Sequence, residues 1–131
     1  MQERNERFDY VIGDLTDTPV DANFSESSSN TWNFLNYVLK LGIQLIIPNT
    51  GKYLTHFNGK SVPKMICEYE QMLNNLSVQS DRSLKCEFTH SESFVPSFQE
   101  VWLFYQVSMI NAHKQFILCT IKCECIYLDD D

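Results

Sequence analysis

The stretch FDYVIGDL, residues 8–15, sets the expected fold of this chain. Its apolar centre runs from Tyr10 to Ile12, and polar residues follow at once, a pattern typical of a buried parallel strand that ends at a loop. Residues 16–30 continue as a polar segment rich in Thr, Asp and Ser. In open α/β sheets, ligands bind beyond the carboxyl ends of the strands, which is where this polar segment begins.

Alternating helix and strand signals follow. Apolar residues recur at three- and four-residue spacing over residues 31–47, which predicts a helix. Residues 52–57 indicate a second strand, and Pro63 can open a second helix that extends to about residue 76. Residues 84–90 alternate weakly, as an edge strand does. Residues 100–110, EVWLFYQVSMI, give the strongest strand signal because aromatic and β-branched residues are so dense there.

The order of strand, helix, strand, helix, strand and strand predicts an α/β fold with right-handed crossovers and a mostly parallel sheet. The hairpin-like pair at the end of this series predicts an antiparallel last strand. Four strands without a glycine-rich turn correspond to half of an open α/β sheet.

Length, composition and net charge limit the classes of function expected for this chain. The chain has 131 residues, enough for one domain, and its 44% hydrophobic and 13% aromatic content supports a core. A net charge of -7 argues against nucleic-acid binding and suits a cationic ligand. The longest apolar stretch, around residues 41–47, is far short of the roughly 18 residues that suggest a membrane span. We therefore expect no nucleic-acid partner and no membrane partner.

The cysteines bear on compartment and metal binding. There are five, an odd number, and the charged opening MQERNERFDY does not have the apolar run of a signal peptide. A cytoplasmic location with free thiols is the expectation. Cys119, Cys123 and Cys125 have the spacing C-x3-C-x-C without a nearby fourth ligand, so ordinary thiols are favoured over a zinc site. We expect no metal.

Several segments together resemble one enzyme family. They are FDYVIGDLTDTPV at residues 8–20, NTWNFLNYVLKLGIQLI at 30–46, GKYLTHFN at 51–58 and VPSFQEVWLFYQV at 95–107. In this order they are similar to the spermidine/spermine synthase family of aminopropyltransferases, and to its spermine-forming members in particular.

The resemblance implies a domain organisation. Residues 1–108 are similar to the C-terminal part of the family's catalytic domain, which has a methyltransferase-like (Rossmann-like) sheet. Residues 109–131 depart from the family pattern and form a divergent tail. The tail's alternating apolar residues could add a strand against residues 100–110, or could derive from an alternative exon or reading frame.

The resemblance also implies a reaction. The family transfers an aminopropyl group from decarboxylated S-adenosylmethionine, a co-substrate, to a polyamine; spermidine then gives spermine and methylthioadenosine. No metal or prosthetic group takes part. The catalytic acid of the family corresponds to Asp14. A protonated amine has no lone pair for attack, so a carboxylate that orients the amine and accepts its proton fits the chemistry.

Three further positions correspond to substrate-binding residues of the family. Asp17 matches a second acid after the strand, although it could equally be a turn-forming residue before Pro19. Glu100 matches a carboxylate that pairs with the distal amino group of spermidine and sets acceptor length; the simpler interpretation is a solvated strand end. Phe98 replaces a tyrosine, which removes one hydroxyl. His56 stands where the family tends to have glutamine, and it is expected first as a surface or satisfied core residue.

Some family features are not found in this sequence. They are the glycine-rich loop near the co-substrate, the acid that holds its ribose, and the N-terminal domain through which the family forms homodimers. Little or no activity is expected from the chain alone. A non-catalytic α/β interaction or regulatory module is the main alternative, and a methyltransferase is a third. Trp102 and Phe104 are expected as core residues rather than site residues.

Overall fold

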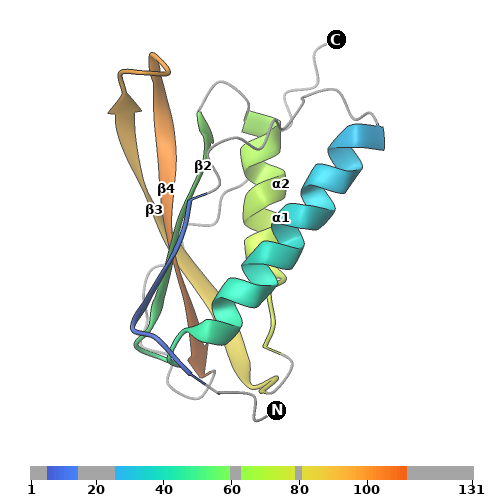
Figure 1. Cartoon of the computed structure of the whole chain (residues 1–131), viewed down its shortest axis with the longest axis vertical. Coiled ribbons are helices and arrows are strands. Elements are labelled where there is room, and N and C mark those ends of the chain that lie inside the picture. The colour runs from blue at the N-terminus through green and yellow to red at the C-terminus, as the bar shows by residue number, and fades with distance from the viewer. Residues whose placement is uncertain (1–5, 15–25, 60–62, 79–80, 112–131) are drawn as a thin grey trace.

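The computed structural model describes residues 6–14, 26–59, 63–78 and 81–111 of the chain (Figure 1). Its elements, in chain order, are β1 (Tyr10–Gly13), α1 (Glu26–Leu45), β2 (Lys52–Gly59), α2 (Pro63–Asn74), β3 (Leu84–Val95) and β4 (Glu100–Asn111). The predicted order of strands and helices is confirmed, as is the start of the second helix at Pro63.

The sheet pairing corrects the predicted fold class. The four strands lie in the order β1-β2-β4-β3. β1 and β2 are parallel, whereas β4 is antiparallel to both β2 and β3. The sheet is therefore mixed and mostly antiparallel, and the expectation of a mostly parallel, partial methyltransferase-like (Rossmann-like) sheet is wrong.

The connection between β3 and β4 explains the difference. Val95 pairs directly with Glu100, so only the four residues 96–99 separate the two strands. Gln99 adopts a left-handed conformation with a φ of 52°. A connection this short joins antiparallel strands only, because parallel strands need a long crossover. The resulting hairpin has two strands of twelve residues each, so it dominates the sheet.

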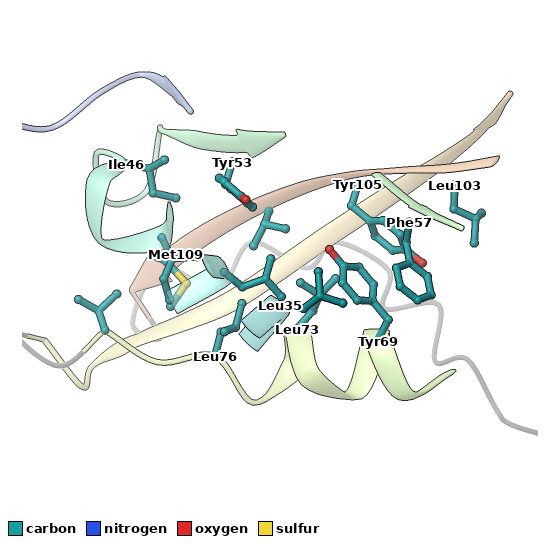
Figure 2. Packing of buried hydrophobic residues seen from close by; sticks show 14 of the residues in the cluster. Leu35, Ile46, Tyr53, Phe57, Tyr69, Leu73, Leu76, Leu103, Tyr105 and Met109 are labelled. Carbon is teal, nitrogen blue, oxygen red and sulfur yellow. The ribbon is translucent and has the colours of Figure 1, made fainter. Parts of the chain in front are cut away.

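Both helices pack on the same face of the sheet, which gives two layers (Figure 1). The hydrophobic core lies between the two helices and the sheet. Figure 2 shows core residues from both helices and from the sheet, among them Leu35 of α1, Leu73 of α2, Tyr53 and Phe57 of β2, and Leu103, Tyr105 and Met109 of β4. Because strand side chains alternate between faces, the residues between these positions on β2 and β4 point to the opposite face.

No helix among the described residues covers that opposite face. Tyr10 and Ile12 of β1 are 67% and 75% exposed there. Within the described part of the chain, β1 pairs on one side only and lies at the edge of the sheet. The expectation of a buried strand over these residues is therefore wrong, since their burial would require a neighbour on the free edge or a layer on the open face.

Close packing at two glycines joins β1, β2 and α1. A β-carbon at Gly13 or at Gly42 would collide with the buried ring of Tyr53. The absence of side chains at these positions lets the Tyr53 ring fit beneath β1 and against α1. This packing fixes the end of β1, and with it the position of the next residue, Asp14.

Some expectations concern parts of the chain outside this description. Asp17 and the cysteines Cys119, Cys123 and Cys125 lie outside the described residues, so their predicted roles stay predictions. Cys86 is a free thiol, but Cys67 is disulfide-bonded, so the expectation of free thiols is wrong at Cys67. Within the described residues, neither helix has the length and apolarity needed to cross a membrane.

Candidate functional site

An open pocket of about 370 Å³ lies on the helix-free face of the sheet, where β1 ends. This volume falls within the usual range of small-molecule sites, about 300–1,000 Å³. The lining residues are Ile12, Gly13, Asp14, Leu54, Thr55, His56, Val95, Phe98, Trp102 and Phe104. They come from the end of β1, from the middle of β2 and from the hairpin of β3 and β4.

Among the described residues, Asp14 is the one acid that lines the pocket. It follows directly after β1, and its side chain is 68% exposed. Its Oδ1 lies 3.1 Å from Nε2 of His56. The structure thus places Asp14, the predicted catalytic acid, in a pocket. Its Oδ1 contacts His56, while most of its side chain is open to solvent.

His56 lies on β2 beside Asp14. Its side chain is only 15% exposed, and its ring packs against Trp102 and Phe104 of β4 at centroid distances of 5.2 and 6.2 Å. Because an ionised carboxylate only accepts hydrogen bonds, we assign the ring hydrogen to Nε2. The other ring nitrogen, Nδ1, is buried and has no hydrogen-bond partner among the described residues.

Four rings of the pocket lining form a surface that we call the aromatic floor: those of His56, Phe98, Trp102 and Phe104. Phe98 and Trp102 are stacked, with centroids 4.3 Å apart and planes at 18°. Trp102 is 8% exposed, while Phe98 is 52% exposed. Aromatic faces carry partial negative charge and attract cations. A carboxylate beside such a floor suits a ligand that combines positive charge with apolar groups.

Glu100 does not line the pocket, but the strand pairing brings it to the same face. It is the cross-strand partner of Val95, which does line the pocket, and it precedes Trp102 by two residues. Glu100 and Phe104 are four residues apart on β4, so at about 3.4 Å per residue they lie about 14 Å apart along the strand. The two predicted carboxylates, Asp14 and Glu100, thus lie toward opposite ends of one apolar surface.

The register of β1 and β2 brings His56, expected first as a surface or satisfied core residue, to the candidate site. Gly13 pairs with Thr55, so the next residues, Asp14 and His56, are neighbours across a parallel pair. Pairing the two strand signals at residues 8–15 and 52–57 in parallel would have indicated this proximity. Trp102, expected in the core, is buried and also lines the pocket, whereas Phe104, expected in the core as well, is 36% exposed on the open face and lines the pocket.

Metal binding finds no support in the described part of the chain. Over residues 6–14, 26–59, 63–78 and 81–111, no three His, Cys, Asp or Glu side chains gather as a metal site would require. Of the described residues that line the pocket, two carry such groups, Asp14 and His56.

No model of a known protein family matches the chain.

Proposed function

We propose that this chain is the acceptor-binding part of an aminopropyltransferase, which moves an aminopropyl group from decarboxylated S-adenosylmethionine to spermidine. The products are spermine and methylthioadenosine. One observation supports this proposal above all: the carboxylate of Asp14 adjoins an aromatic floor in an open pocket, and Glu100 lies further along the same face.

The pocket matches the chemistry of a linear polyamine. Spermidine carries ammonium groups that are separated by methylene chains. An ammonium beside Asp14 gains a charge-assisted hydrogen bond, and the aromatic floor accepts both the cation and its methylene neighbours. Glu100 would bind the distal ammonium and so favour an acceptor of matching length. The net charge of -7 favours the approach of such a cation.

Asp14 is suited to the proton transfer that the reaction needs. The attacking amine must lose a proton before its nitrogen can form a bond to the carbon beside the sulfonium. The positive sulfonium lowers the pKa of a neighbouring ammonium, because like charges disfavour each other. Asp14 then holds the nitrogen in line and accepts the proton. As the new C–N bond forms, the C–S bond breaks and neutral methylthioadenosine leaves. The 68% exposure of the Asp14 side chain lets water take the proton away.

A reconstituted enzyme tests the proposal. The chain is fused behind the upstream half of a spermine synthase, and spermine formation is measured with spermidine and decarboxylated S-adenosylmethionine. We expect product from the fusion and a loss of at least 100-fold in rate for Asp14→Asn, in line with the usual share of a general base. A folded fusion that makes no spermine, or one that is indifferent to Asp14→Asn, would contradict the proposal.

A non-catalytic polyamine-binding module is the second candidate. The observation that favours it is that Asp14, Glu100 and the aromatic floor, the groups that would bind a polyamine, all belong to this chain. Such a module would bind spermidine with the same dependence on Asp14, yet its fusion would transfer no aminopropyl group. The fusion assay and a direct binding assay together separate the two candidates.

A further inference from the structure

We infer that His56 is a positioning residue that makes polyamine binding at Asp14 depend on pH, with binding favoured when the imidazole is neutral. This inference rests on the proposed function and adds a regulatory property to the same site. It starts from the geometry of His56, whose ring lies between the Asp14 carboxylate and the indole of Trp102.

The neutral ring supports cation binding in two ways. Its Nε2–H donates to Oδ1 of Asp14 over 3.1 Å, which orients the carboxylate and leaves its full negative charge and its remaining lone pairs for a ligand. Its π face continues the aromatic floor beside Trp102 and Phe104. An ammonium can then bind Asp14 without meeting another positive charge in the pocket.

The protonated ring opposes cation binding. It forms an ion pair with Asp14, so the carboxylate that would hold the ligand is already neutralised. It also places a positive charge beside the site of the ligand's ammonium, and like charges repel. Protonation adds a hydrogen at the buried Nδ1, for which no described residue offers an acceptor, so the charged ring fits this position poorly.

Other charged groups near the pocket do not explain such a response. The described residues of the hairpin that line the pocket are all apolar or aromatic. Asp14 and His56 are therefore the titratable groups among the described residues of the pocket lining. On the same strand as His56, Lys52 donates to Ser108 Oγ over 2.7 Å, four residues away. The second histidine of the described chain, His90, lies 3.4 Å from Glu70 on the helix-covered face.

Spermidine titrations by calorimetry between pH 8.0 and pH 5.5, at constant ionic strength, test the inference. The variants are the wild-type chain and His56→Gln, which keeps a hydrogen-bond donor but cannot be protonated. Histidine is the side chain that ordinarily changes charge in this range, while polyamine amines stay protonated. We expect the wild-type affinity to fall at least tenfold toward pH 5.5 and the His56→Gln affinity to change less than threefold.

The outcomes separate the inference from the proposed function. His90 is present in both proteins, so a difference between them reports on His56, and a thermal melt at each pH confirms that both are folded. If His56→Gln does not fold, His56→Asn replaces it. No binding at pH 8.0 by the folded wild type would overturn the proposed function, and the inference with it. Binding with the same pH dependence in both proteins would overturn the inference alone.

Discussion

Nε2 of His56 lies 3.1 Å from Oδ1 of Asp14, across the parallel pair of β1 and β2. This contact joins the candidate acid to the aromatic floor, because the same His56 ring packs against Trp102. The charge of the pocket and its apolar surface are thus held together by one side chain. The predictions below test this pocket and the fold that positions it.

Truncation of an exposed aromatic residue should weaken polyamine binding without loss of stability. Phe98 is 52% exposed and stacks on Trp102. An exposed cation–π contact contributes about 0.5–1 kcal/mol, so Phe98→Ala should lower spermidine affinity about two- to fivefold. Phe94→Ala is the matched control, since Phe94 is 59% exposed but does not line the pocket. Calorimetric titrations that show equal losses for both variants would argue against the aromatic floor.

An added methyl group at Gly42 should destabilise the fold although it favours a helix. Alanine gains about 1 kcal/mol over glycine within a helix. A β-carbon at Gly42 would, however, lie 2.5 Å from the ring of Tyr53, which is 2% exposed and has little room to move. Overpacking of this kind costs about 1–3 kcal/mol. We expect a net loss in the free energy of unfolding, measured by urea denaturation. A more stable Gly42→Ala variant would mean that the Tyr53 ring does not occupy this place.

The sequence predicts the elements of this fold better than their arrangement. Apolar spacing located α2 and the hairpin strands because local periodicity is set within each element. The position of β4 between β2 and β3 depends on long-range pairing, such as that of Phe57 with Leu103, which no local pattern records. The family resemblance singled out Asp14, but the proximity of His56 to it depends on the register of Gly13 with Thr55.

Loss of a buried carboxylate on α2 should destabilise the protein. Glu70 is 6% exposed and accepts a hydrogen bond from the hydroxyl of Tyr105 over 3.0 Å. Glu70→Ala removes that acceptor within the core, and the change should cost about 1–3 kcal/mol in the free energy of unfolding. Glu68→Ala removes the same charge from a less buried position of the same helix and should change stability by about 0.5 kcal/mol or less. Urea denaturation that gives equal effects for both variants would contradict this contact.

Cys86 should resist alkylation in the folded protein. Burial raises the pKa of its thiol from 9.0 to about 12, with a smaller contribution from the charge of Glu87. The thiolate is the reactive form, so iodoacetamide at pH 8 should modify Cys86 only after unfolding in urea, as peptide mass spectrometry will show. Rapid modification of the folded protein would contradict the burial of this thiol.

The raised pKa of the Cys86 thiol also makes the free energy of unfolding depend on pH. Between pH 9 and pH 12 the unfolded thiol of Cys86 ionises while the folded thiol keeps its proton. The stabilisation from the neutral folded thiol is therefore complete below pH 9 and is lost as the pH rises toward 12. Cys86→Ser should lose less stability over this interval than the wild type does.

The most direct test of the account is a spermidine titration at pH 8 of the wild-type chain, Asp14→Asn and Asp9→Asn. Asp9 is an exposed acid just before β1 that does not line the pocket, so its substitution controls for the loss of one negative charge. We predict that Asp14→Asn binds at least about tenfold more weakly than the wild type, as the loss of a charge-assisted hydrogen bond requires, and that Asp9→Asn binds within twofold of it. Equal affinity for wild type and Asp14→Asn, or equal losses for the two variants, would contradict a polyamine site at Asp14.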